Sequence, residues 1–386
     1  MKRLLFIMSL LTVFLVAGTL KLQAAPIPDG FAGKPPPHRI ESGSVGAYFY
    51  GYISSDGAVI VPPKLIAAWP FHDDRARVIA PETGKYGFIN PCGDYIIAPN
   101  LAAAADFSEG MAAVKLTGDG LYVYINTGGE LVIAPQYTAA HPFINGRARV
   151  NVDGVTAYID KQGVELLRIP YLRVLDTKSD RIAFQTEDRK LGFMDYHGKV
   201  IVEPQYRAII EWSILMFNEP ITPVGLDKKY GFIDKNGAVV VDFIYDWVHQ
   251  FREGLAVVSK DGRYGFLDNS GKIAIPLQFE DAWDFSEGLA AVKIKGRWGF
   301  IDRGGTIVIE PQFLNPRFGV PIGFHEGLAA VRTENGSGYI DREGNMVIAP
   351  VYASAGDFSG GVAEVRFPNL TYINKQGQYL WPRPSE

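Results

Sequence analysis

Six histidines are the first residues in this sequence that could do chemistry, because a neutral imidazole can act as a general base or bind a metal ion. None of them lies in a His-Glu-x-x-His motif or forms a close pair. His72 and His325 also occupy the same position of a repeated segment, because each directly follows a phenylalanine that recurs in that segment. We therefore interpret them as variable residues at strand edges and expect no metal site. The six are His38, His72, His141, His197, His249 and His325.

Serine and glutamate candidates also fail as catalytic groups. Residues 356–361 (Gly-Asp-Phe-Ser-Gly-Gly) resemble a nucleophile loop in outline, but residues 106–110 repeat the pattern, and the sequence has no Gly-x-Ser-x-Gly elbow. A catalytic acid needs a unique pocket, whereas one glutamate register recurs at Glu109, Glu253, Glu287 and Glu326. We predict a structural role in turns for this register and no catalytic residue.

An acidic or amide residue, replaced by a serine in one copy, recurs with a glycine three residues later, a spacing that suggests calcium loops. One carboxylate per turn falls well short of the six to eight oxygen ligands that calcium takes. We interpret these residues instead as acceptors for backbone N–H groups, with the glycine supplying a left-handed conformation. Phosphate loops and dinucleotide motifs are missing from the sequence, so we expect no cofactor. The ten turn residues are Ser54, Asn90, Asn126, Asp160, Asp195, Asp234, Asp268, Asp302, Asp341 and Asn374.

All these residues recur because the chain contains about ten copies of one segment, spaced by 33 to 39 residues. Such a period marks a solenoid, a propeller or a similar array. The copies align on a glycine or its substitute, and the next residue is aromatic in all ten. The aligned positions are Gly51, Gly87, Val123, Ala157, Gly192, Gly231, Gly265, Gly299, Gly338 and Thr371.

Each copy is predicted to be a three-stranded antiparallel meander, as in residues 285–313. Its third strand is rich in β-branched residues and reaches a proline, where we expect strand pairing to stop. A phenylalanine such as Phe251 or Phe285 follows and is expected to fill the core between units. The fold class is therefore an all-β tandem array of about ten units of ~34 residues.

Two closures of this array are possible. A propeller blade usually has four strands, and a propeller usually has four to eight blades. Ten units with three strands each fit an open, solenoid-like array better, and we favour it. The alternative is a closed, propeller-like ring.

The motif of the repeat resembles a known family. A Gly-Leu-Ala-Ala-Val strand (residues 288–292), the pair Trp298-Gly299, a Phe-Ile-Asp turn (residues 300–302) and an Ile-x-Pro-Gln ending (residues 309–312) are similar to WG repeats, also called KWG repeats. The resemblance covers roughly residues 48–381. It implies a β-rich, bacterial protein whose family is generally without an assigned biochemical activity, and it carries over no catalytic residue.

The N-terminal residues predict export. A basic start, an apolar run from Leu4 to Leu20, and small residues at Ala24 and Ala25 indicate a signal peptide over residues 1–25. A Pro-rich linker is expected over residues 26–47 and the repeat array over residues 48–386. The alternative for the leader, a membrane anchor, is disfavoured by the length of the run and the small residues. No later segment is apolar enough to span a membrane.

Charge and cysteine content narrow the class of partner. The chain has a net charge of −4, and loss of the three basic residues of the leader leaves −7. An acidic surface argues against nucleic acid. The single cysteine, Cys92, allows no internal disulfide and lies at a variable turn position. A reactive thiol or an intermolecular bridge at Cys92 is the alternative interpretation.

The sequence thus favours a non-enzymatic binding or scaffold protein, periplasmic or extracellular, that presents a β surface to a protein or a cell-envelope component. Two insertions offer candidate binding loops: Ile214, Leu215, Met216 and Phe217 in one, and Arg317 and Phe318 in the other. One alternative is a glycan- or peptidoglycan-binding module that uses tryptophans, although we expect these to pack between units. The other is a propeller-like hydrolase with a central pocket, which requires ring closure and convergent His, Asp or Glu side chains.

Overall fold

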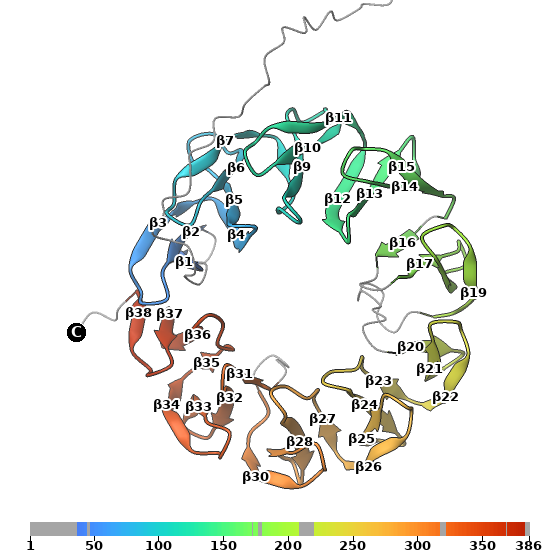
Figure 1. Cartoon of the computed structure of the whole chain (residues 1–386). Coiled ribbons are helices and arrows are strands. Elements are labelled where there is room, and N and C mark those ends of the chain that lie inside the picture. Colours follow the sequence, from blue (N-terminus) through green and yellow to red (C-terminus); the bar gives the residue numbers. More distant parts are fainter. Residues whose placement is uncertain are drawn as a thin grey trace, which may run out of the picture.

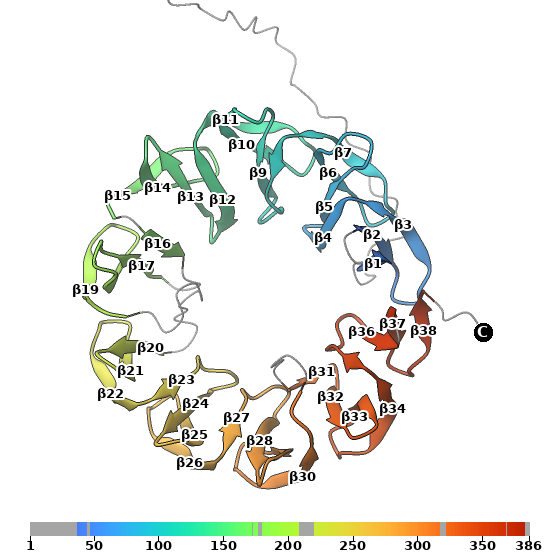
Figure 2. The same cartoon turned by 180° about the vertical axis from the view of Figure 1, so that it is seen from behind.

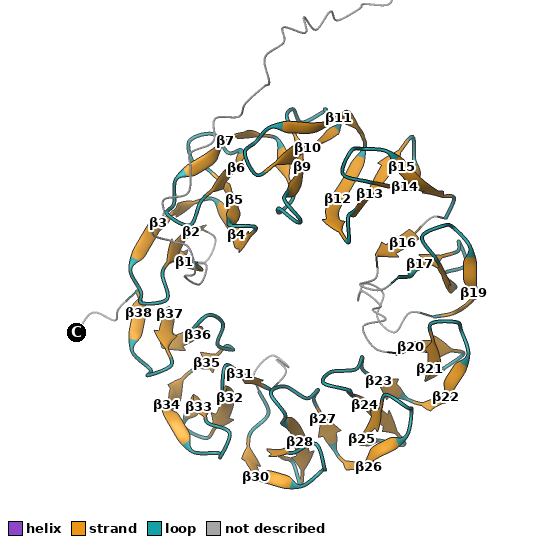
Figure 3. Ribbon diagram, viewed as in Figure 1, coloured by secondary structure: helices purple, strands orange, loops and turns teal. Residues whose placement is uncertain are grey.

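The computed structural model describes residues 37–44, 47–171, 173–176, 180–207, 220–316, 322–367 and 369–382. These residues form ten small antiparallel sheets arranged in a ring around a central opening (Figure 1). Figure 3 shows strands and loops throughout the described ranges, without a helix. We call the sheets blades 1 to 10 in chain order.

The first five blades cover residues 38–206. Blade 1 contains β1 (His38–Ser44), β2 (Ala47–Ile53) and β3 (Val59–Leu65); blade 2 contains β4 (Ala67–His72), β5 (Arg75–Ile79), β6 (Tyr86–Ile89) and β7 (Tyr95–Leu101); blade 3 contains β8 (Ala103–Ala104), β9 (Met111–Lys115), β10 (Tyr122–Asn126) and β11 (Leu131–Tyr137); blade 4 contains β12 (Ala139–Ile144), β13 (Arg147–Val152), β14 (Val155–Ile159) and β15 (Glu165–Ile169); blade 5 contains β16 (Arg173–Asp176), β17 (Ile182–Gln185), β18 (Leu191–Met194) and β19 (Val200–Tyr206).

The last five blades cover residues 221–381. Blade 6 contains β20 (Ile221–Leu226), β21 (Lys229–Asp234) and β22 (Val239–Tyr245); blade 7 contains β23 (Trp247–Val248), β24 (Leu255–Lys260), β25 (Arg263–Asp268) and β26 (Ile273–Phe279); blade 8 contains β27 (Asp281–Ala282), β28 (Ala290–Ile294), β29 (Arg297–Ile301) and β30 (Ile307–Phe313); blade 9 contains β31 (Phe324–His325), β32 (Leu328–Thr333), β33 (Gly336–Ile340) and β34 (Met346–Tyr352); blade 10 contains β35 (Ser354–Ala355), β36 (Val362–Phe367), β37 (Asn369–Asn374) and β38 (Tyr379–Trp381).

Within each blade the strands pair in chain order, from the central opening to the outside of the ring. The expectation of three strands per unit is wrong for eight blades, which have a fourth, innermost strand among the described residues. In five blades that strand is only two residues long, as in β27 and β35. A two-residue strand carries no periodic pattern, so sequence periodicity could not detect it.

Blades 1 and 10 meet and close the ring, as Figures 1 and 2 both show. Ile40 and Ile53 of blade 1 are buried in one cluster with Val362, Tyr372 and Leu380 of blade 10. The all-β repeat array is therefore confirmed. Its closure is the ring that we gave as the alternative, and not the open array that we favoured.

In the part of the chain that the structure describes, no strand crosses this seam, because blade 1 is made only of β1 to β3 and blade 10 only of β35 to β38. Two polar contacts accompany the apolar cluster. The backbone N–H of Glu41 donates to the Tyr372 hydroxyl at 3.3 Å, and His38 Nε2 lies 3.0 Å from the carbonyl oxygen of Gly360. Side-chain packing across the seam therefore holds the ring closed.

Strand β1 also corrects the expected start of the array. It covers residues 38–44, which the sequence assigned to the Pro-rich linker. Its pairing with β2 and the burial of Ile40 in the seam make this segment part of blade 1. The predicted signal peptide and residues 26–36, 45 and 46 of the predicted linker lie outside the described residues.

The proline in the third main strand lies in a β-bulge. We had expected strand pairing to end at this proline, and that expectation is wrong. In blade 8, Trp298 pairs with Phe313 and Phe300 pairs with Ile309, so residues two apart in β29 face residues four apart in β30. Pro311 lies in the additional stretch of the bulge, where its lack of a backbone N–H removes no hydrogen bond from the ladder. The strand resumes beyond it.

The recurrent glycine lets the backbones of the two strands approach closely at this bulge. A Cβ on Gly299 would lie 2.5 Å from the carbonyl oxygen of Ile309 and 2.7 Å from the nitrogen of Pro311, both backbone atoms. The same approach occurs at Gly51, Gly87, Gly231, Gly265 and Gly338. Blade 4 has Ala157 at this position and pairs there without the bulge, whereas blade 3 has Val123 and keeps the bulge.

The predicted phenylalanine plug between units is confirmed. Phe324 of blade 9 and Phe300 of blade 8 are both fully buried, with ring centroids 5.0 Å apart and the rings at 62°. Aromatic pairs with nearly perpendicular rings contribute about 0.5–1.5 kcal/mol beyond the area that they bury. Six further pairs join neighbouring blades in this way: Tyr52–Phe71, Phe88–Phe107, Tyr124–Phe143, Phe232–Phe251, Phe266–Phe285 and Tyr339–Phe358.

The recurrent acidic turns have the structural role that we predicted. Asp302 Oδ1 accepts hydrogen bonds from the backbone N–H groups of Gly304 and Thr306, both at 2.9 Å. Gly305 then adopts a left-handed conformation, with φ of 82°. The turn residues of most other blades make the same two bonds, so these carboxylates are already engaged in the fold.

Candidate functional site

The repeated glutamates form contacts from blade to blade, which we call carboxylate clasps. Glu253 accepts bonds from the backbone N–H groups of Glu287 and Gly288, at 2.7 and 2.9 Å. Glu287 in turn accepts bonds from Glu326 and Gly327, at 2.6 and 2.9 Å. Each clasp binds the turn of the next blade. The repeated register is therefore structural, as predicted.

The clasp between blades 9 and 10 is made by Glu326, which binds the N–H groups of Gly360 and Gly361 and the Lys375 ammonium. Burial alone would raise the pKa of the Glu326 carboxyl. The hydrogen bonds from Lys375, Gly361 and Gly360 outweigh burial and hold this pKa below its usual value. Because the folded pKa is lowered, the clasp stabilises the fold above the unfolded pKa of about 4.3, and this contribution disappears as the pH falls through the folded pKa.

We therefore expect Glu326→Gln to lower the free energy of unfolding by about 1 kcal/mol at pH 7 and by much less at about pH 3, because one charge-assisted contact is lost only where the wild-type carboxyl is ionised. Urea unfolding at the two pH values measures this difference. Glu343→Gln, on an exposed turn of blade 9, is the matched control and should change neither value. If the free energies of unfolding of the wild type and Glu326→Gln differ by the same amount at both pH values, the clasp is contradicted.

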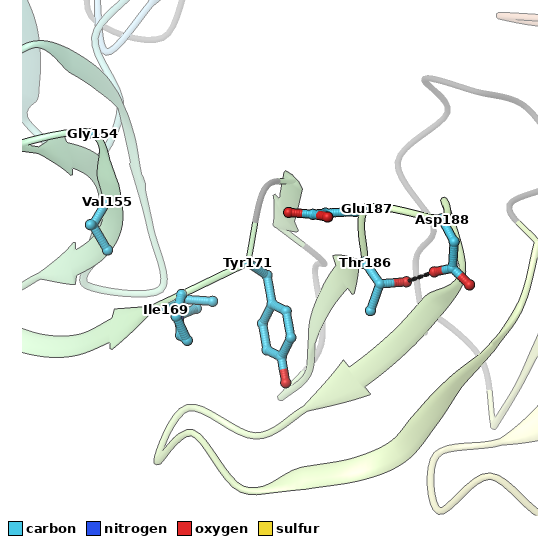
Figure 4. Close-up of a pocket in the computed structure, with 8 residues that line it drawn as sticks. Gly154, Val155, Ile169, Tyr171, Thr186, Glu187 and Asp188 are labelled. Atoms are coloured by element: carbon cyan, nitrogen blue, oxygen red, sulfur yellow. Dashed lines mark hydrogen bonds between the residues drawn. The ribbon is translucent and has the colours of Figure 1, made fainter.

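A cavity of about 720 Å³ lies between blades 4 and 5 (Figure 4). Two of its polar side chains bind each other: the Thr186 hydroxyl donates to Asp188 at 2.5 Å, and Lys190 lies 3.2 Å from Asp188. Tyr171 stacks on Phe184 with centroids 4.1 Å apart. We interpret this cavity as a gap beside a divergent blade.

Two other cavities adjoin at the inner edge of the ring, in blades 7 to 10. The first, about 440 Å³, is lined by Arg252, Trp283, Asp284, Phe285, Ser286, Ile322, Gly323, His325 and Asp357. The second, about 470 Å³, is lined by Pro316, Ile322, Ala330, Val331, Arg332, Ser337, residues 353–357, Glu364 and Arg366. They share Ile322 and Asp357, so they form one continuous feature, which we call the inner-edge cavities.

Two histidine–aspartate pairs mark this feature. His249 Nδ1 lies 2.8 Å from Asp284 Oδ1, and His325 Nε2 lies 3.4 Å from Asp357 Oδ2. Burial raises the pKa of the Asp357 carboxyl, and the neighbouring His325 offsets this only in part. Burial and the nearby Glu41 likewise raise the pKa of Glu364. The inner edge of blades 7 to 10 therefore gathers several carboxylates, of which Asp357 and Glu364 are also exposed to solvent.

Ser286, His325 and Asp357 line the same cavity, which raises the question of a catalytic triad. The Ser286 hydroxyl donates to the carbonyl oxygen of Phe324 at 2.6 Å. Ser108 makes the equivalent bond to Phe143 at 2.7 Å in blade 3. A triad requires that the serine hydroxyl donate to the imidazole. This serine instead has the repeated structural role of joining neighbouring blades.

The binding loops proposed from the sequence, at residues 214–217 and at Arg317 and Phe318, lie outside the described residues. The sequence treated His325 as a variable edge residue, and it lies in the edge strand β31. Its pairing with Asp357 was not foreseen. The sequence feature that could have indicated this pair is the position of the aspartates. Asp284 and Asp357 each directly precede the buried phenylalanine of their blades, as does Asp106.

We expected the tryptophans to pack between units, and the described ones pack both within blades and between them. The ring of Trp69 lies under the Arg77 guanidinium, 3.9 Å from centroid to Cζ, and Trp247 meets Tyr230 with centroids 5.9 Å apart. Trp283 packs against the core of blades 8 and 9 and also lines an inner-edge cavity. Trp212 lies outside the described residues.

The part of the chain that the structure describes contains neither a cluster of metal ligands nor a membrane-spanning helix. In those ranges no three His, Cys, Asp or Glu side chains gather where they could hold a metal ion. The same ranges contain no helix long and apolar enough to cross a bilayer. Cys92 is a free, half-buried thiol, and burial together with the nearby Asp94 raises its pKa. A raised pKa lowers the thiolate fraction and so disfavours a reactive role.

Comparison with known proteins identifies the repeat. The family model described as "WG containing repeat" matches residues 50–79, 86–119, 124–155, 192–230, 230–264, 264–298, 298–336 and 338–367. The stretch left between 155 and 192 includes the divergent start of blade 5. No curated protein sequence matches the chain at a significant level.

Solved structures with similar folds align only loosely. The computationally designed Ika8 protein is 14% identical, with 72% of this chain and 95% of that chain covered and a TM-score of 0.36. A eukaryotic initiation factor is 12% identical, with 76% and 92% covered and a TM-score of 0.47. BamB from Moraxella catarrhalis is 12% identical, with 71% and 88% covered and a TM-score of 0.32. At these scores they carry no argument about function.

Proposed function

The chain belongs to the WG containing repeat family, as the motif around Trp298-Gly299 had suggested, and from this premise we propose that it is an exported, non-enzymatic scaffold that binds an envelope component or a protein at its inner-edge cavities. One observation carries the proposal. The motif residues common to the copies are engaged in bulges, turns, clasps and aromatic pairs, so specificity must come from residues that differ between copies. Charged residues of that kind converge at the inner edge of blades 7 to 10.

Export is supported by the sequence alone. The basic start, the apolar run and the small residues at Ala24 and Ala25 have the order of a secretory leader. A single cysteine suits an oxidising compartment, because one thiol cannot form a wrong internal disulfide. We place the mature protein in the periplasm or outside the cell.

A non-enzymatic role is favoured over the hydrolase alternative, although the ring closes and His and Asp side chains do converge. The Ser286 hydroxyl donates to a backbone carbonyl, as Ser108 does, so it is not poised as a nucleophile. His249 and His325 face carboxylates at the cavity rim. Side chains of this kind can bind a polar ligand without changing it.

The proposal is tested by expressing the full-length chain with a C-terminal tag in a bacterium, cross-linking the cells and purifying the tagged protein. We expect a mature chain that lacks 24 or 25 residues and is joined to one envelope component. Arg252→Glu and Arg332→Glu should each lower its recovery about tenfold, the usual effect of losing one charge-assisted contact. Lys85→Glu, on an exposed turn of blade 2, is the control. An uncleaved chain, or equal recovery with all variants, argues against the proposal.

A further inference from the structure

We infer that the inner-edge cavities bind a linear oligosaccharide without net charge. This inference rests on the proposed function and names the class of ligand for that site. The two cavities, about 440 and 470 Å³, each fall within the range of about 300–1,000 Å³ that small-molecule sites occupy. Because they share Ile322 and Asp357, a ligand longer than one cavity can continue from one into the other.

The lining offers hydrogen-bond donors and acceptors in balance. The positively charged lining residues are Arg252, Arg332 and Arg366, and the negatively charged ones are Asp284, Asp357 and Glu364. Carboxylates accept from hydroxyl groups and guanidinium groups donate to them, so a polyol can use both. A strongly anionic or cationic ligand would meet three like charges. The equal count therefore favours a ligand without net charge.

Apolar and aromatic surfaces complete this lining. Trp283 and Phe285 line the first cavity, beside His325 and Asp357. Alanines and Val331 line the second. A sugar ring has apolar C–H faces and polar hydroxyls at its edge, so it fits a wall that combines flat apolar surface with charged edges.

An extended peptide is the other polymer that such a groove could take. Peptides bind sheet edges by adding a strand, which requires a row of unpaired backbone groups. The innermost strands here are β27, β31 and β35, each two residues long. They are too short to supply such a ladder. Recognition must come from side chains, as in saccharide binding.

Blade 10 has an open cavity because one side chain is missing. Two residues before the buried phenylalanine, other blades have Trp69, Ala105, His141, His249, Trp283 or Ile322, and blade 10 has Gly356. Gly356 has no left-handed φ, and a Cβ there would lie 3.3 Å from the carbonyl oxygen of Glu364. Gly356→Trp therefore puts into blade 10 a side chain that blades 2 and 8 accommodate, and it should fill the second cavity.

The test is calorimetric titration of the mature chain with neutral hexasaccharides: β-1,4-linked glucose, β-1,4-linked N-acetylglucosamine and α-1,4-linked glucose. A β-1,4-linked glucosamine hexamer, a uronic acid hexamer and an extended hexapeptide are the comparisons. We expect at least one neutral saccharide to bind, and to be recovered uncleaved. Asp357→Asn and Gly356→Trp should each weaken binding of the saccharide about tenfold or more. The first variant removes a charged hydrogen-bond acceptor, and the second fills the space that the saccharide would occupy. Asp153→Asn, at an exposed turn of blade 4, should bind like the wild type.

Each other result counts against the inference. Absence of binding by all neutral saccharides, preferred binding of the charged hexamers or the peptide, or unchanged affinity in both cavity variants overturns it. If Asp357→Asn abolishes cross-linking to the envelope component while no saccharide binds, the proposed function stands and only the ligand class is wrong. If cross-linking is also unaffected, both fail. Cleavage of a bound saccharide would overturn the non-enzymatic assignment.

Discussion

Gly299→Ala is expected to lower the free energy of unfolding by about 3 kcal/mol or more, at the upper end of the range for overpacked sites. The new methyl group would lie 2.5 Å from the carbonyl oxygen of Ile309, and backbone atoms of Pro311 lie within 2.9 Å. Backbone cannot rotate away as a side-chain tip can, so β29 and β30 must separate at the bulge. Urea-induced unfolding, followed by tryptophan fluorescence and circular dichroism, measures the loss.

Gly118→Ala is the matched control for this substitution. A Cβ on Gly118 would meet no atom within 4 Å, and the residue has no left-handed φ. Its stability should remain within about 0.5 kcal/mol of the wild type. Equal stability of the two variants would show that the strand pair can shift to admit a side chain, as blade 3 does for Val123. Close backbone approach would then not explain the glycine.

Ile53→Asp is expected to cost about 4 kcal/mol or more and to open the ring between blades 1 and 10. Ile53 is fully buried in the seam with Ile40, Tyr372 and Leu380. A carboxylate there would be buried without a partner, or would be protonated at a cost in free energy. None of the described strands crosses the seam, so the blades on each side can part while the other sheets keep their pairing.

Small-angle X-ray scattering together with circular dichroism distinguishes an opened ring from a globally unfolded chain. An opened ring has a larger radius of gyration than the closed ring but keeps its β signal in circular dichroism. Val59→Asp provides the control in the same blade, since Val59 is 43% exposed in β3 and its substitution should leave both signals unchanged. Coincident loss of both signals in Ile53→Asp would mean that the ring unfolds as one unit. That result would contradict a separately openable seam.

The candidate site was less predictable than the fold. Ser286 and Asp357 each belong to a repeated segment, so their sequence surroundings resemble those of residues with structural roles. Asp357 and His325 are 32 positions apart in the sequence and meet because adjacent blades bring their inner edges together. The cavity beside them depends on Gly356, where a missing side chain leaves space. Neither a distance between blades nor an empty volume is encoded in a local pattern.

By itself, the sequence determined the repeating unit: its turns, its recurrent glycine, its aromatic pair and its all-β class. These features follow from local sterics and from periodic burial, which act within one copy and are repeated in each. The tertiary structure alone decided that the array closes, that the inner strand exists, and that Glu253 and Glu287 bind the next blade. Closure depends on small rotations between successive blades that accumulate around the ring. No single residue specifies that sum, so only the packed assembly of all ten blades reveals it.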